Sequence, residues 1–145
     1  MSRLRSLIGW LCLIAVAVTF SWAGGIKAWD PQVFSRDIDA YQLLPWPLVV
    51  ATALYLPWLE LMTAVTLFLP RWRDATAWVL GLMLLIFLFA LGAAWWRGLD
   101  IVCGCFGDAG RSGYLWPLAR DVLLITALIV GVRWTRPAQP RQTAA

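Results

Sequence analysis

Two cysteines separated by a single residue are the part of this sequence best suited to chemistry. Cys103 and Cys105 flank Gly104, with Phe106 and Gly107 next in the chain. Because Gly104 can adopt backbone angles that a side chain forbids, the segment indicates a turn or loop that presents two sulfur atoms together. Two thiols held in this way can exchange electrons with another dithiol, form a fixed bridge or bind a soft metal ion.

The spacing of the two cysteines determines which kind of disulfide they can form. Residues two apart hold their Cα atoms near the upper distance limit for a disulfide, so closing such a small ring strains it. A strained, exposed disulfide is typically labile and oxidising, and it must be re-oxidised after it accepts electrons from a partner dithiol. A permanently reduced or permanently bridged turn is the simpler alternative.

A metal site is the competing interpretation of the thiol pair. The chain has no histidine, which excludes imidazole-ligated zinc, copper and haem sites within one subunit. Two thiolates together with Asp100 or Asp108 could still hold a soft ion such as Cu(I) or Hg(II) transiently. The third cysteine, Cys12, lies within an apolar run, where we expect it to act as a small apolar filler.

The composition around this loop is that of an integral membrane protein. Of the 145 residues, 61% are hydrophobic and 14% are charged, whereas soluble domains have about 25% charged residues. A membrane-spanning helix needs roughly 20 mostly apolar residues. Four such windows fill the chain, at about residues 7–23, 46–69, 75–96 and 115–134. We therefore predict an all-α fold, a bundle of four transmembrane helices in one membrane domain over residues 1–135.

The stretches between the windows carry their own signals. Asp30-Pro31 is a helix start, and apolar residues recur at helical spacing among charged ones over residues 31–41, which predicts a short amphipathic helix on the bilayer surface. The connection at residues 71–74 is so short that the second and third spans should be antiparallel neighbours. Pro57 predicts a kink in the second span.

The distribution of basic residues predicts the orientation in the membrane. Seven of the twelve Lys and Arg residues lie at the chain start, in the 71–74 connection, or at and beyond the end of the fourth span. Because cytoplasmic segments are enriched in Lys and Arg, we expect a multi-pass protein of the bacterial inner membrane with both termini cytoplasmic. Residues 136–145 would form a disordered cytoplasmic tail. The helix at 31–41 and the thiol loop at 97–113 then face the periplasm, where disulfides persist.

Two features of the sequence have more than one interpretation at this stage. The first window could be a signal peptide cleaved after Ala23, but the Gly-Gly-Ile-Lys stretch that follows indicates a helix exit, so we expect a retained span. The net charge of +4 could suggest nucleic acid, but the basic residues cluster at the ends of apolar runs. We therefore expect a lipid bilayer, and no nucleic acid, as the partner of this surface.

Four charged side chains are candidate supporting groups. Glu60 is a carboxylate deep in the second span, which indicates either a functional group or a protonated or hydrogen-bonded group that fixes packing. Arg120 lies near the outer end of the fourth span and could extend to the surface, so we do not expect it to pair with Glu60. Lys27 and Arg97 flank the outer mouth, where each could stabilise a cysteine thiolate or simply anchor a helix.

Eleven tryptophans are many for this length, and most of them fall at predicted interfaces, as in the aromatic belts of membrane proteins. A membrane quinone could stack among Trp95, Trp96 and Phe106 beside the thiol loop. The belt accounts for these residues without a cofactor, so a quinone is a possible cofactor rather than an expected one.

Several stretches, in their order along the chain, resemble a known family. They are Gly25-Ile26-Lys27, Asp30-Pro31, Phe34 and Ile38 with Tyr41-Gln42-Leu43-Leu44-Pro45, Leu56-Pro57-Trp58-Leu59-Glu60, and Arg97-Gly98 before Cys103-Gly104-Cys105-Phe106-Gly107. Over about residues 5 to 135 the chain resembles the methylamine utilisation protein MauE family, within the broader DoxX-like four-helix membrane proteins. Where that family often has Arg-Asn, this chain has Arg120-Asp121.

The resemblance implies a multi-pass inner-membrane accessory protein. It implies a role in maturation or export of a disulfide-rich periplasmic dehydrogenase subunit, alongside a thioredoxin-like partner, MauD. We therefore expect Cys103 and Cys105 to exchange electrons with a periplasmic thioredoxin-like protein or a disulfide-containing client; if this is catalysis, the enzyme is a thiol-disulfide oxidoreductase. The alternatives are a non-catalytic assembly factor that docks a periplasmic partner, and a soft-metal carrier.

Overall fold

A computed structural model describes residues 2–99 and 115–135, and all the regular structure in these ranges is helical. Among the described residues, four helices are long and apolar enough to cross a membrane, and a short one lies between the first two. The prediction of an all-α protein with four membrane-length helices is confirmed. The helices are α1 (Ser2–Trp29), α2 (Pro31–Ala40), α3 (Trp46–Thr66), α4 (Arg73–Trp96) and α5 (Leu115–Thr135).

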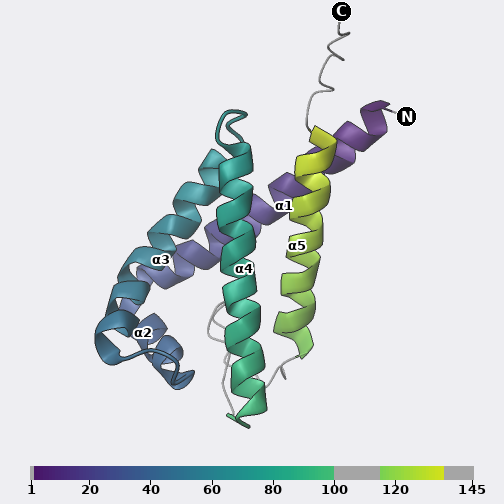
Figure 1. Ribbon diagram of the computed structural model, residues 1–145. Coiled ribbons are helices and arrows are strands. Elements are labelled where there is room, and N and C mark those ends of the chain that lie inside the picture. Colours follow the sequence, from purple (N-terminus) through teal and green to yellow (C-terminus); the bar gives the residue numbers. More distant parts are fainter. Residues whose placement is uncertain (1, 100–114, 136–145) are drawn as a thin grey trace, which may run out of the picture.

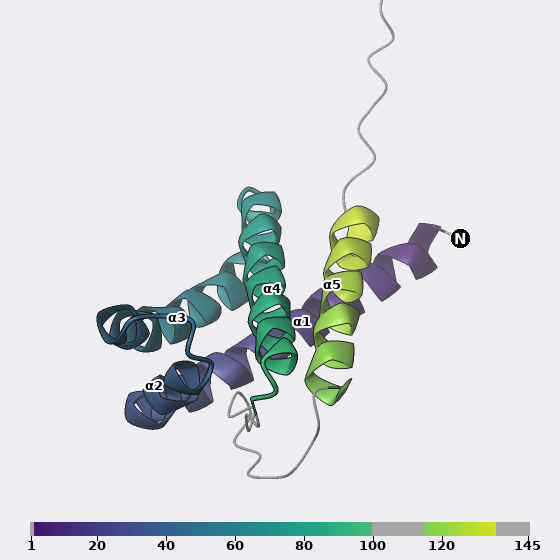
Figure 2. The same cartoon turned by 60° about the horizontal axis from the view of Figure 1, so that its bottom comes forward.

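Helix α1 is longer than the predicted first span. It continues through Gly24 and Gly25 to Trp29, so the expected helix exit at this stretch is wrong. At 1.5 Å per residue its 28 residues extend about 42 Å, which exceeds a hydrocarbon core of roughly 30 Å and favours a tilted helix. Figures 1 and 2 show α1 crossing α4 and α5 obliquely.

Glycines allow α1 to approach α3 and α5 closely. A Cβ atom added at Gly24 would lie 3.0 Å from the carbonyl oxygen of Pro57 and 3.1 Å from Cβ of Glu60. A Cβ atom added at Gly131 of α5 would lie 2.7 Å from Cδ2 of Leu13. Small residues at such contacts let helix backbones pack tightly within a membrane. Helix α1 is consequently packed between α3 and α5, which do not contact each other in the described chain.

The core is apolar, and so is much of the outer surface. Buried side chains from α1, α4 and α5 pack against the end of α3 in one continuous cluster. Trp78, Ile86 and Phe89 of α4 are exposed, as are many other large apolar side chains. Because an aqueous surface rarely carries so much contiguous apolar area, these exposed side chains fit a lipid bilayer.

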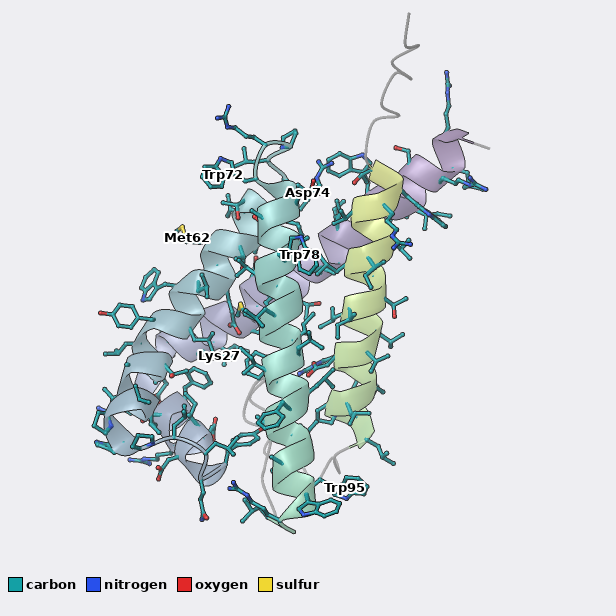
Figure 3. All side chains as sticks on the ribbon, in the orientation of Figure 1. Lys27, Met62, Trp72, Asp74, Trp78 and Trp95 are labelled. Carbon is teal, nitrogen blue, oxygen red and sulfur yellow. The ribbon has the colours of Figure 1, made fainter. Side chains whose placement is uncertain are left out.

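Different helix ends lie at the two ends of the bundle. The start of α1 and the end of α5 lie at one end, where Arg73 at the start of α4 donates to the hydroxyl of Thr135 at 3.3 Å. Helix α2, the end of α4 and the start of α5 lie at the other end (Figure 1). Trp72 and Trp95 mark these two ends in Figure 3. The two helix ends that flank residues 100–114 in the chain therefore lie at the end of the bundle where α2 lies.

Candidate functional site

A buried ion pair joins α1 to α3 inside the bundle. The ammonium Nζ of Lys27 lies 2.5 Å from Oε1 of Glu60, and the two side chains are 3% and 1% exposed. Figure 3 places Lys27 between the levels of Trp72 and Trp95. The expectation that Lys27 anchors at the outer mouth is therefore wrong, because the tilt of α1 and its continuation through Gly24 carry this residue into the bundle.

Two aromatic rings lie close to the Lys27 ammonium, in addition to Glu60. Its Nζ lies 5.1 Å from the ring centroid of Phe34 in α2 and 5.1 Å from that of Phe87 in α4. A cation over an aromatic face is attracted by the ring quadrupole, more strongly where water is excluded. Lys27 thus links α1 to α2, α3 and α4 at once.

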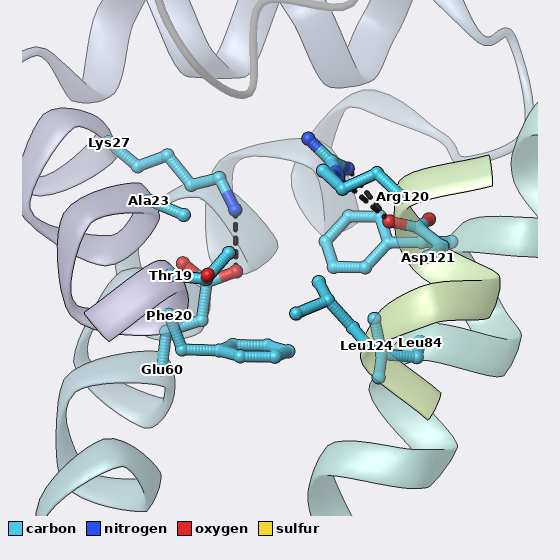
Figure 4. Close-up of a pocket in the computed structure, with 10 residues that line it drawn as sticks. Thr19, Phe20, Ala23, Lys27, Glu60, Leu84, Arg120, Asp121 and Leu124 are labelled. Carbon is cyan, nitrogen blue, oxygen red and sulfur yellow. Dashed lines mark hydrogen bonds and ion pairs between the residues drawn. The ribbon is translucent and has the colours of Figure 1, made fainter. Parts of the chain in front are cut away.

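A second pair of charges lies on α5, facing the first (Figure 4). The Nε and Nη2 atoms of Arg120 donate to Oδ1 of Asp121 at 3.1 and 2.8 Å. Asp121 is 2% exposed, while the Arg120 side chain is 25% exposed. Arg120 therefore compensates the buried carboxylate beside it, and whether its side chain extends to the membrane surface stays a prediction.

Both charge pairs line one small cavity of about 30 Å³. Lys27 and Glu60 bound it from α1 and α3, and Arg120 and Asp121 from α5 (Figure 4). The Oε2 atom of Glu60 is buried and has no hydrogen-bond partner among the described residues. A cavity of this size holds about one water, which would satisfy this oxygen. We call Lys27, Glu60, Arg120 and Asp121 the charge quartet.

The quartet was only partly predicted from the sequence. Glu60 was expected to meet a neighbouring helix or stay protonated, and the structure gives it Lys27 as its partner. Arg120 does share a cavity with Glu60, although its hydrogen bonds go to Asp121. Asp121 was not predicted as a site residue. The available signal was an adjacent pair of opposite charges close to the start of an otherwise apolar helix.

Arg97 has a different position from the quartet, at the end of α4. Its Nη1 atom donates to the backbone carbonyls of Tyr41 and Gln42 at 3.3 and 3.1 Å. Gln42 has a positive φ of 50°, which is uncommon for a residue with a side chain. Arg97 therefore clamps the connection between α2 and α3 onto the end of α4.

Helix α2 directs Phe34 and Ile38 toward the bundle, while Val33 is exposed. Its start is capped as predicted, because Oδ1 of Asp30 accepts hydrogen bonds from the backbone nitrogens of Gln32 and Val33 at 3.2 and 3.0 Å. Phe34 is buried, and Ile38 lies with it in the wall of a second, larger cavity. This arrangement weakens the docking alternative, because these side chains face inward rather than toward a partner protein.

The comparison with known proteins then decides the family. Residues 5–133 match the model of the family described as "Methylamine utilisation protein MauE". The chain belongs to the MauE family. It is 42% identical over 91 residues to a "Methylamine utilization protein MauE" of Methylophilus methylotrophus, a match that covers 62% of this chain and 48% of that protein. No solved structure matches the chain.

A second relative extends the match over nearly the whole chain. The "Methylamine utilization protein MauE" of Paracoccus denitrificans is 28% identical over 136 residues, or 93% of this chain and 73% of that protein. The match to the Methylophilus protein, by contrast, spans only about half the length of that relative. The resemblance to MauE predicted from the sequence is confirmed, whereas the wider DoxX-like relationship stays a prediction.

The residues that carried the MauE resemblance fall into two groups in this structure. Lys27, Glu60 and Arg120 meet around one cavity, and Arg97 lies apart on the α2 connection. The predicted thiol pair and its neighbours lie outside the described residues, namely Cys103, Gly104, Cys105 and Phe106. Cys12, within α1, is a free cysteine. The redox and soft-metal interpretations of the thiol pair therefore stay predictions.

Proposed function

We propose that this chain is an inner-membrane accessory protein of thiol-disulfide exchange. In this proposal Cys103 and Cys105 exchange electrons with a periplasmic thioredoxin-like protein or with a client whose disulfides mature there. The observation that carries the proposal is the position of the two helix ends that flank the thiol segment in the chain. The end of α4 and the start of α5, between which the segment runs, lie at the same end of the bundle as α2.

The proposed orientation of the protein in the membrane rests on the distribution of basic residues and on the arrangement of the helices. The start of α1 and the end of α5 share one end of the bundle, and that end is enriched in basic residues. Cytoplasmic segments carry such an excess, so we place both termini in the cytoplasm and α2 at the periplasmic surface of the bilayer. A thiol pair on that side would meet an oxidising compartment.

The charge quartet has a positioning role in this proposal. A cation that is already paired with a carboxylate stabilises a second anion less, so Lys27 is a poor candidate for lowering a thiol pKa. We assign that role instead to Arg97, which lies at the end of α4 from which the thiol segment begins. The quartet would hold α1, α3 and α5 in one arrangement, and this includes the start of α5, which follows the thiol segment in the chain.

The biological setting is proposed at the level of the family. The relatives named above are called methylamine utilization proteins. We propose that the client of this chain is a disulfide-containing periplasmic protein of a methylamine-type pathway.

The test is the redox state of the thiol pair in intact cells. Cells that produce the Cys12→Ser protein are treated with a membrane-impermeant maleimide before and after mild reduction, so that labelling reports only Cys103 and Cys105. We expect labelling only after reduction. Free thiols that label without reduction would overturn the redox role, and an absence of labelling until the cells are permeabilised would overturn the orientation.

A second experiment measures disulfide formation in the client protein. The Cys103→Ser, Cys105→Ser double variant should leave client disulfides incomplete, while Cys12→Ser should have no effect. Complete client disulfides in the double variant would reject thiol-disulfide exchange and favour the assembly factor.

A further inference from the structure

A second cavity, of about 490 Å³, lies between α2, α3 and α4. This volume is within the range of small-molecule sites, roughly 300 to 1,000 Å³, and such sites commonly form between the helices of bundles. Phe34 and Phe87 lie in its wall, and the same two rings contact the Lys27 ammonium. The aromatic rings therefore separate this large cavity from the buried charge of Lys27.

The chemistry of the walls is mostly apolar with a few polar groups. Leu56 of α3 and Met83 of α4 represent the apolar lining, and Asp37 of α2 contributes the one carboxylate among the described residues that line the cavity. Partial burial raises the pKa of the Asp37 carboxyl above its usual value. In its protonated form, Asp37 can donate a hydrogen bond to a neutral oxygen at one edge of this apolar site.

These walls discriminate among the molecules that a bilayer can supply. No Lys or Arg is among the described residues that line the cavity, so the phosphate of a phospholipid would find no cation there. A neutral ring with carbonyl oxygens needs no cation, can accept a hydrogen bond from protonated Asp37 and packs against the rings of Phe34 and Phe87. An isoprenoid tail would follow the apolar lining toward the lipid.

We propose that the cavity between α2, α3 and α4 binds the ring and the first part of the tail of a membrane quinone, with Asp37 as its polar contact. This location differs from the one considered from sequence, among Trp95, Trp96 and Phe106. Trp95 and Trp96 are exposed at the end of α4 and do not line the cavity.

A bound quinone would supply the acceptor that the proposed thiol chemistry needs. Oxidation of a dithiol breaks two S–H bonds, forms one S–S bond and releases two electrons and two protons. A quinone takes up both electrons and both protons and becomes a quinol, so the exchange balances. This role rests on the proposed thiol function, whereas quinone binding itself does not.

The binding test uses the purified full-length protein in phosphatidylcholine nanodiscs. A photoreactive azido-ubiquinone analogue is crosslinked, and the labelled peptides are mapped by mass spectrometry. We expect labelling in α2 and in the 83–90 part of α4, and we expect an excess of decylubiquinone to suppress it at least tenfold. Labelling that decylubiquinone does not suppress, or that a decyl alcohol without a quinone ring suppresses equally, would overturn the proposal in favour of a lipid or alkyl chain.

Two matched substitutions test the cavity itself. Ala90→Phe places a ring in the cavity wall, and we expect it to reduce labelling about tenfold, while Ala75→Phe, at an exposed position of the same helix, should leave it unchanged. Equal effects of the two variants would overturn the assignment. Ala90→Phe counts only if it elutes as one symmetric species in size exclusion, and the α2 variants below provide the independent measurement.

The polar contact has its own set of variants. Asp37→Leu should weaken quinone binding about tenfold, because one hydrogen bond to the ring is lost. Asp37→Asn keeps a donor and should stay within about twofold of the parent, and Asp39→Leu, at an exposed position of the same helix, should have no effect. Equal binding by Asp37→Leu and the parent would remove Asp37 from the site.

The thiol variants separate this proposal from the proposed function. The Cys103→Ser, Cys105→Ser double variant should bind quinone as well as the parent protein does. Retained quinone binding with unchanged client disulfides would reject only the thiol function. If the parent protein does not bind quinone, while client disulfides still depend on both cysteines, only the quinone site is rejected.

Discussion

Lys27 and Glu60, 33 positions apart in the chain, form an ion pair of 2.5 Å that is almost completely buried within the bundle. Each residue lies on a different helix, and their meeting depends on the oblique path of α1 across the bundle. A buried charge is strongly destabilising unless it is paired. This relationship therefore links the tilt of one helix to the stability of the whole fold.

The first prediction concerns removal of one partner of this pair. Lys27→Met leaves the Glu60 carboxylate buried without a cation, and we expect a loss of about 3 to 5 kcal/mol in the free energy of unfolding. The Lys27→Met, Glu60→Gln double variant removes both charges and should recover most of that loss. Unfolding of the purified protein, followed by tryptophan fluorescence, measures both values. Additive losses in the double variant would show that the two residues do not act as a pair.

The second prediction uses two adjacent glycines in α1. A Cβ atom at Gly24 would lie 3.0 Å from the backbone oxygen of Pro57, whereas one at Gly25 would meet nothing within 4 Å. Gly24→Ala should therefore force α1 from α3 and destabilise the protein by about 1 to 3 kcal/mol. Gly25→Ala should be neutral or stabilising by up to about 1 kcal/mol, because alanine favours the helix. The same unfolding measurement compares them, and equal effects would contradict close packing at Gly24.

The number and type of the helices could be predicted from the sequence because they follow from local signals. Apolar runs of membrane length identify α1, α3, α4 and α5, and Asp30 with Pro31 identifies the start of α2. Each of these signals depends on residues that are neighbours in the chain. The start of α2 is an example, since the cap involves only Asp30 and two backbone nitrogens that follow it.

The position of Lys27 could not be predicted in the same way. Counting residues from the end of each span assumes upright helices, which places Lys27 at the outer surface and Glu60 far below it. The tilt of α1 depends on its packing against α3 and α5, which no local pattern reveals. The sequence pattern at Gly24 predicted a helix end, but this glycine lies within α1 and permits close contact between α1 and α3.

The third prediction concerns the pH dependence that Asp37 contributes. Burial raises its pKa in the folded protein above the usual value, so the folded state holds this proton more tightly than the unfolded state. The stability should then fall as the pH rises from about 4 through the folded pKa. Asp37→Asn should remove this decline and unfold at a higher temperature at pH 7 than the parent does.

The control for this measurement is Asp39→Asn, at an exposed position on the same helix. Both variants lose one carboxylate from α2, so the difference between their melting curves from pH 4 to pH 7 isolates the effect of burial. Equal curves for the two variants would show that burial of Asp37 does not affect stability.

The last prediction concerns the clamp between α4 and the connection that precedes α3. Arg97 donates to the carbonyls of Tyr41 and Gln42, and Arg97→Met removes both hydrogen bonds while it keeps an unbranched, apolar stem. We expect backbone amides between α2 and α3 to exchange hydrogen about thirtyfold faster, since about 1 kcal/mol of local stability is lost for each of the two bonds. Hydrogen exchange read by mass spectrometry provides the measurement, with Arg71→Met, an exposed arginine at the opposite end of the bundle, as the control. Equal protection of this connection in both variants would show that the two hydrogen bonds of Arg97 do not stabilise it. The proposed effect on the thiol segment would then be the remaining role for Arg97.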